Sequence, residues 1–142
     1  NHRRGLFDRV LIKDNHRELA SFGGAAGIRQ AVRAARRKHP DLVVEVEADT
    51  LTEVRAALDA GADWILLDNM SDAQLAAAVK LTAGRARLEA SGGITLARLP
   101  ALARLGLDAV SLGAITHSAP AADIAMDLRP PPPSATKRRC ER

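Results

Sequence analysis

Five short apolar runs, each ending in polar residues or glycine, constrain the fold of this chain more than any other feature. They are Val10-Leu11-Ile12, Val43-Val44-Glu45-Val46-Glu47, Trp64-Ile65-Leu66-Leu67-Asp68, Arg87-Leu88-Glu89-Ala90-Ser91-Gly92 and Ala109-Val110-Ser111-Leu112-Gly113. From the second run onward they recur about every 21–23 residues, which leaves room for one helix between successive strands. Such tight alternation predicts parallel strands joined by right-handed crossovers. The expected fold is therefore α/β, a partial (β/α) barrel of about five parallel βα units.

Local signals place the helices between these strands. The first helix follows the loop Ser21–Gly24 and ends near Lys38, just before a proline. Capping residues introduce the next three helices: Thr50 with Glu53, Ser71 with Gln74, and Thr95. A further short helix is expected up to about Leu128.

Composition separates the chain into a barrel portion, residues 1–128, and a tail, residues 129–142. Apolar residues make up 46% of the chain and aromatic residues only 2%, which suits helices packed on a buried sheet and not a base-stacking surface. The tail holds five Lys or Arg and one Glu, so it accounts for the whole net charge of +4. Its run Pro130–Pro133 and its polar, basic remainder predict a disordered segment.

The remaining global features point to a cytoplasmic protein. The single cysteine, Cys140, excludes an internal disulfide and favours a reducing compartment. No apolar run approaches the roughly 20 residues of a membrane span, and no signal peptide is recognisable. The chain opens on Asn1, inside what reads as site sequence, so we expect it to be a piece of a longer protein.

Cations and glycines at the strand ends predict an anion-binding site. Three cations flank the first strand: His2, Arg3 and Lys13. They suit a small anionic ligand. Ser91-Gly92-Gly93 stands between a strand and a helix, and Gly113 follows the next strand, as in the usual phosphate site of (β/α) barrels. His117 could contact the same phosphate, although a loop histidine is more often merely exposed.

Carboxylates at the ends of the middle strands form the second group of candidates. Glu47 and Asp68 could bind ribose hydroxyls or a divalent cation, since Mg²⁺ prefers one or two carboxylates together with phosphate oxygens. Glu45 shares a strand face with Glu47 because the two are separated by two residues. Glu45 and Glu89, one layer deeper, could pair with Lys13 or with each other, or form structural ion pairs in the barrel interior.

Five motifs in order resemble the quinolinate phosphoribosyltransferase family, also called nicotinate-nucleotide pyrophosphorylase (carboxylating). They are Asn1-His2-Arg3-x-Gly5-Leu6-x-Asp8 with Leu11-Ile12-Lys13-Asp14-Asn15-His16, then Glu45-Val46-Glu47, Ile65-Leu66-Leu67-Asp68-Asn69, Glu89-Ala90-Ser91-Gly92-Gly93-Ile94 and Gly113-Ala114-Ile115-Thr116-His117-Ser118-Ala119-Pro120. The resemblance covers residues 1 to about 128. It implies a reaction that joins quinolinate to 5-phosphoribosyl-1-pyrophosphate and releases pyrophosphate and CO2 to give nicotinate mononucleotide, in de novo NAD biosynthesis.

The resemblance also implies roles for individual residues. His2, Arg3 and Lys13 would hold the quinolinate carboxylates, and Glu47 and Asp68 would serve the ribose and a Mg²⁺ ion, which makes Lys13, Glu47 and Asp68 the catalytic candidates. The phosphate pocket would be lined by Ser91, Gly92, Gly113 and His117. A full-length protein would form a homo-oligomer. The family's N-terminal α/β domain and first barrel strands, with further site arginines, have no counterpart in this sequence, so we expect the chain alone to be inactive.

Three other functions remain open at this point. The chain could be a relative of the same architecture linked to molybdenum transport, or a phosphoribosyltransferase for a monocarboxylate, although the three cations around the first strand favour a diacid. It could also be a non-catalytic piece whose basic tail binds nucleic acid. The small charge of the tail and its lack of aromatic residues argue against that function.

Overall fold

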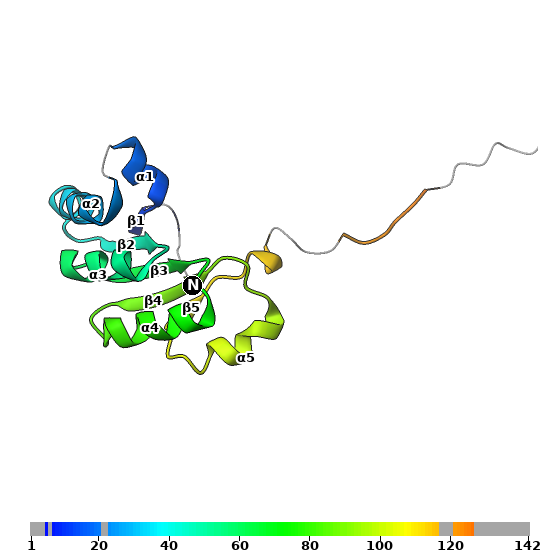
Figure 1. Cartoon of the computed structure of the whole chain (residues 1–142). Coiled ribbons are helices and arrows are strands. Elements are labelled where there is room, and N and C mark those ends of the chain that lie inside the picture. Colours follow the sequence, from blue (N-terminus) through cyan, green and yellow to red (C-terminus); the bar gives the residue numbers. More distant parts are fainter. Residues whose placement is uncertain (1–4, 6, 21–22, 117–120, 127–142) are drawn as a thin grey trace, which may run out of the picture.

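One parallel sheet organises the protein in a computed structural model that describes residues 5, 7–20, 23–116 and 121–126. Its strands are β1 (Arg9–Ile12), β2 (Val43–Ala48), β3 (Trp64–Asp68), β4 (Arg87–Ser91) and β5 (Ala109–Val110). Every neighbouring pair is parallel and the order is β1-β2-β3-β4-β5 (Figure 1). A sheet whose strands follow chain order is the wall of a barrel, whereas a doubly wound sheet reverses its order at a switch point. The predicted fold class is confirmed.

Helices connect the strands and cover one side of the sheet. They are α1 (Asp14–Leu19), α2 (Gly24–Lys38), α3 (Leu51–Ala60), α4 (Asp72–Thr82) and α5 (Leu99–Leu102), with 3₁₀ turns η1 (Leu96–Arg98) and η2 (Gly113–Ile115). Two predicted caps are confirmed, because Thr50 and Ser71 accept hydrogen bonds from the backbone N–H groups of Glu53 and Gln74. These caps begin α3 and α4 directly after the strand ends that carry the candidate site residues.

Three local predictions were wrong. Helix α1 was not expected, because six residues are too few to show helical periodicity. Thr95 makes no side-chain cap, and its helix begins instead with the 3₁₀ turn η1. Residues 121–126 form no helix, and their large apolar side chains, Ile124 and Met126, are 86% and 84% exposed. A short helix needs an apolar face packed on a core to be stable. The tail 129–142 lies outside the described residues.

The two faces of the sheet differ in chemistry. Val44, Val46 and Ala48 alternate onto the helix-covered face of β2, where they are fully buried in the apolar core. Glu45 and Glu47 occupy the opposite face of the same strand, and both are buried as well. In a barrel this second face is the interior. The two carboxylates of β2 are therefore directed toward the interior and the strand end, where a site can form.

No helix within the described ranges is long and apolar enough to cross a membrane.

Candidate functional site

Lys13 and Glu47 form an ion pair where β1 and β2 end. The parallel register sets Ile12 beside Val46, so the residues that follow them, Lys13 and Glu47, are also neighbours. The Lys13 Nζ atom lies 3.2 Å from Glu47 Oε2, with the lysine side chain 44% exposed and the glutamate side chain 8% exposed. The lysine therefore presents a cation at the strand end while the carboxylate beneath it stays covered.

The two partners titrate away from their ordinary values in the same direction. Burial raises the pKa of Glu47, the hydrogen bond and charge of Lys13 oppose this, and nearby Asp68 raises it further. The hydrogen bond to Glu47 and then its charge raise the pKa of Lys13. Lys13 is consequently cationic at neutral pH, and the charge of Asp68 acts on the buried Glu47 carboxyl group.

Asp68 ends β3 and is held toward β4 by the residue that follows it. Its Oδ2 atom accepts a hydrogen bond of 2.7 Å from Asn69 Nδ2. Asn69 has a left-handed backbone, with φ of 52°, and its N–H donates to the carbonyl of Ser91 at 3.0 Å. Asp68 also stands opposite Ser91 in the sheet register. The β3 carboxylate and the turn after β4 are thus parts of one rim.

The predicted glycine turns line one cleft of about 480 Å³ at this rim. Its lining residues are Ser91, Gly92, Gly93, Ile94, Thr95, Ser111, Gly113 and Ala114. Gly92 and Gly93 both have positive φ, 84° and 57°, which favours glycine. A Cβ on Gly92 would collide with the Asn69 side chain and lie 2.8 Å from the Asn69 backbone nitrogen, whereas one on Gly93 would meet nothing within 4 Å. Gly92 therefore permits loop packing, and Gly93 leaves space open to a ligand.

Of the pairings predicted for the deeper carboxylates, the structural ion pair in the barrel interior is confirmed for Glu45. Glu45 binds neither Lys13 nor Glu89, and its Oε2 atom lies 3.0 Å from Arg9 Nη1. Glu89 accepts a hydrogen bond of 2.5 Å from the Ser111 hydroxyl, which lines the glycine cleft. Lys13 is taken by Glu47 instead. Sequence reasoning left Arg9 and Ser111 out, although the two-residue spacing already placed Arg9 on the same strand face as Leu11 and Lys13.

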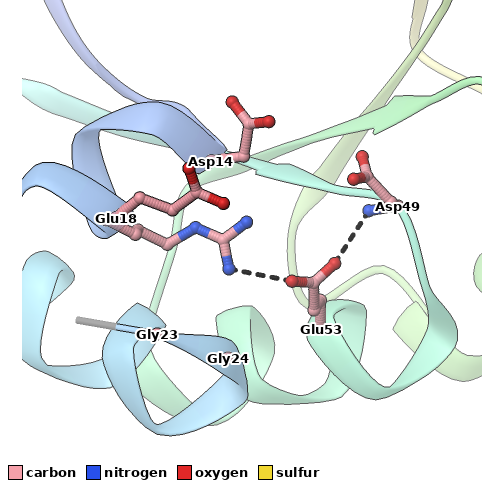
Figure 2. Close-up of a pocket in the computed structure, with 7 residues that line it drawn as sticks. Asp14, Glu18, Gly23, Gly24, Asp49 and Glu53 are labelled. Atoms are coloured by element: carbon pink, nitrogen blue, oxygen red, sulfur yellow. Dashed lines mark hydrogen bonds and ion pairs between the residues drawn. The ribbon is translucent and has the colours of Figure 1, made fainter. Parts of the chain in front are cut away.

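A second cavity, of about 220 Å³, includes Asp14, the residue after Lys13, and is lined mostly by acidic residues (Figure 2). Asp14, Arg17, Glu18, Gly23, Gly24, Asp49 and Glu53 line it. Arg17 Nη1 lies 2.8 Å from Glu53 Oε1, and the other oxygen of Glu53 accepts from the Asp49 N–H at 3.0 Å. Burial, then the charges of Glu53 and Asp68, raise the pKa of Asp49. The Arg17–Glu53 pair ties α1 to the start of α3 and so holds the segment after Lys13 in place.

Three predicted site residues cannot be placed. His2, Arg3 and His117 lie outside the described residues. Of the expected cation cluster the structure therefore places Lys13 alone. It brings together the other predicted groups along one rim, in the order Lys13, Glu47, Asp68, and then the cleft of Ser91, Gly92 and Gly113.

Sequence comparisons identify a family model and several relatives that this chain resembles. Residues 1–127 match the family described as quinolinate phosphoribosyl transferase, C-terminal domain. The probable nicotinate-nucleotide pyrophosphorylase [carboxylating] of Bacillus subtilis is 43% identical over 129 residues, which cover 90% of this chain and 43% of that relative. The human nicotinate-nucleotide pyrophosphorylase [carboxylating] is 41% identical, again over 90% of this chain and 43% of its own length. The chain thus spans less than half of the relatives that it matches.

Solved structures agree with the sequence matches. The nicotinate-nucleotide pyrophosphorylase from Francisella tularensis superimposes with a TM-score of 0.72 at 42% identity, covering 82% of this chain and 39% of that one. The enzyme of the same name from Ehrlichia chaffeensis gives a TM-score of 0.74 at 37% identity, covering 82% and 41%. A thiamine phosphate pyrophosphorylase from Pyrococcus furiosus, 17% identical with a TM-score of 0.59, shares the fold.

Proposed function

This chain belongs to the quinolinate phosphoribosyltransferase family, and on that premise we propose that it supplies the rim on which quinolinate reacts with 5-phosphoribosyl-1-pyrophosphate. The products would be nicotinate mononucleotide, pyrophosphate and CO2. One observation carries the proposal: a cation, two carboxylates and a glycine-lined cleft follow one another along the strand ends. A pyridine diacid, a ribose and a phosphate require those three kinds of group in the same order.

The side chains suit positioning and electrostatic catalysis. Lys13 would neutralise a quinolinate carboxylate and aim the ring nitrogen at the anomeric carbon of the ribose. Glu47 and Asp68 would favour the positive charge that develops on the ribose in an oxocarbenium-like transition state. The amides of the Gly92–Gly93 turn would face the phosphate, with the space at Gly93 left open for its approach. Loss of CO2 from the adduct then follows on the substrate, helped by its cationic ring nitrogen.

The residues at the rim fit a Mg²⁺ ion that arrives with the pyrophosphate. Glu47 and Asp68 are close enough that the charge of Asp68 raises the pKa of Glu47, so a divalent cation between them would relieve repulsion. The described residues contain no group of three or more His, Cys, Asp or Glu able to cage a metal. Mg²⁺ characteristically completes its shell with phosphate oxygens and water. When bound, it would stabilise the charge of the departing pyrophosphate.

A chimaera tests the proposed function. The part of the Bacillus subtilis relative that the match leaves uncovered would be joined to this chain, and formation of nicotinate mononucleotide from quinolinate and from nicotinate would be measured alongside the 142-residue chain alone. We expect turnover by the chimaera with quinolinate and none with nicotinate. Turnover with nicotinate, or a folded chimaera without turnover, would contradict the assignment.

Lys13→Ala in the same chimaera isolates the predicted diacid contact. Loss of the cation should weaken quinolinate binding by at least about 2 kcal/mol, the scale for unpairing a charged contact in a site. Arg104→Gln is the matched control, because Arg104 is an exposed cation away from the rim. Equal affinities in the Lys13 variant and the control would remove Lys13 from the site.

The homo-oligomeric state implied by the family resemblance and the cytoplasmic location expected from the single cysteine stay predictions. Light scattering on the chimaera and on the chain alone would check the first of them.

A further inference from the structure

We propose that Arg98 is a positioning residue for the glycine cleft, acting as a staple between the β3–α4 loop and the β4–α5 loop. The β3–α4 loop, residues 69–71, follows Asp68. The β4–α5 loop, residues 92–95 with η1, carries the glycine turn. The inference rests on the proposed function insofar as the cleft is taken to bind phosphate.

Three hydrogen bonds attach Arg98 to the neighbouring loop. Its Nε and Nη2 atoms lie 2.9 and 2.6 Å from Asp72 Oδ1, and Nη2 lies 3.0 Å from the carbonyl oxygen of Met70. Met70 is 3% exposed, so the carbonyl belongs to a well-packed segment. Asp72 is the first residue of α4, where a carboxylate is also stabilised by the helix dipole.

A second attachment closes the arrangement at the other end of the β4–α5 loop. The Asn69 N–H donates to the Ser91 carbonyl at 3.0 Å, and the Asn69 side chain occupies the space that a Cβ on Gly92 would need. The β4–α5 loop is thus fixed to residues 69–72 both before and after its glycines. Gly93, between the two attachments, faces the open cleft.

Arg98 itself is absent from the cleft lining, so its guanidinium is not a phosphate ligand in this arrangement. Its effect on the cleft would be indirect. Two glycines with positive φ give the loop many alternative conformations, and the staple selects the one in which the cleft exists. The same staple fixes the backbone that carries Asp68, so it would set the distance between the ribose carboxylate and the phosphate amides.

The first measurement needs no ligand. Amide hydrogen exchange at Asn69, whose N–H is bonded to the Ser91 carbonyl, would be compared in the 142-residue chain and in Arg98→Gln, Asp72→Asn and Arg104→Gln variants. We expect exchange about tenfold faster in the first two variants, because a charge-assisted contact that restrains local opening is lost. Arg104→Gln, which removes an exposed cation with no contact to the loop, should change nothing. Unchanged exchange in Arg98→Gln would overturn the proposal.

The second measurement separates positioning from simple attraction. Inorganic phosphate and pyrophosphate would be titrated against the same variants, with urea unfolding to show that global stability is retained. Asp72→Asn removes a negative charge, so electrostatics alone predicts tighter anion binding, whereas the staple predicts binding about fivefold weaker. Arg98→Lys should recover part of the loss. Tighter binding by Asp72→Asn would overturn the role of Arg98. An unmodified chain that binds neither anion, while exchange at Asn69 still responds to Arg98, would support the staple and contradict the phosphate assignment of the cleft.

Discussion

The two faces of the sheet both contain fully buried side chains, but these are apolar on one face and charged on the other. On the helix-covered face, Val44, Val46, Ile65 and Leu67 have no exposed surface, and their burial is a favourable transfer from water. On the interior face, Glu45 and Glu89 are equally buried, although burying a carboxylate is costly without partners. The helix-covered face stabilises the fold. The interior face holds buried carboxylates, whose desolvation is unfavourable unless each has a hydrogen-bond or ion-pair partner.

A cation on the interior face therefore makes several directed contacts. Arg9 both pairs with Glu45 and stacks on Trp64, at 5.1 Å from its ring centroid, while Arg87 stacks on the same ring at 5.5 Å. One aromatic ring thus contacts two guanidinium groups at the amino end of the sheet. The comparison teaches that the interior face is organised by directed contacts, so single substitutions there should act through charge more than through volume.

The largest effect should come from making a hole in the helix-covered face. Ile65→Ala should lower the free energy of unfolding by about 3 kcal/mol, because the lost methylenes leave a cavity in a close-packed core. The neighbouring Leu66→Ala is the matched control on the interior face, where the side chain is 8% exposed, and about half the effect is expected there. Urea unfolding of both variants measures the difference. Equal losses would mean that the two faces are packed alike.

The next largest effect should follow from removing one charge of the interior pair. Arg9→Gln leaves Glu45 buried without its cation, and we expect a loss of about 2 kcal/mol in unfolding free energy at neutral pH. Arg87→Gln loses only a cation–π contact at an exposed site, for which about 0.5 kcal/mol is expected. The pair shares one tryptophan, so Trp64 fluorescence reports on both variants. Comparable losses would show that stacking, and not the ion pair, holds Arg9.

The smallest effect concerns pH. The contributions of Glu47, on the interior face, and of Glu53, in helix α3, to the free energy of unfolding should change with pH in opposite directions. The pKa of Glu47 is raised from 4.5, chiefly by burial. Its contribution to the free energy of unfolding is therefore fully present below pH 4.5 and is lost as pH rises through the folded-state pKa. Burial also acts to raise the pKa of Glu53, but hydrogen bonds from Arg17 and the Asp49 N–H outweigh it and lower the pKa from 4.5. The contribution of Glu53 to the free energy of unfolding is thus present above pH 4.5 and is lost as pH falls through the folded-state pKa.

Glu47→Gln and Glu53→Gln variants would be unfolded in urea between about pH 3 and pH 7. The deficit of the Glu53 variant relative to the unmodified chain should be greatest at the upper end and shrink on acidification. The Glu47 variant should show the reverse trend. Parallel trends in the two variants would contradict the opposite environments assigned to these carboxylates.

Much of this molecule is determined by local patterns in the sequence. The apolar runs place all five strands, and their spacing through single helices leaves parallel pairing in chain order as the compact solution. The two-residue period puts Glu45 and Glu47 on one face. Glycines after the last strands indicate the cleft that the structure shows.

Only the tertiary structure decided which charged groups meet. From the sequence, Lys13 was as good a partner for Glu45 as any other cation. The register sets Leu11 beside Glu45, so Arg9 and Lys13 lie one step to either side on the same face, and Glu47 takes the lysine at the strand end. Arg9 is then left for Glu45. Similarly, Arg98 meets Asp72 across 26 residues of chain, a contact that depends on how two loops fold back on their strands. Local periodicity carries no information about such distances, because they are set by register and side-chain length together.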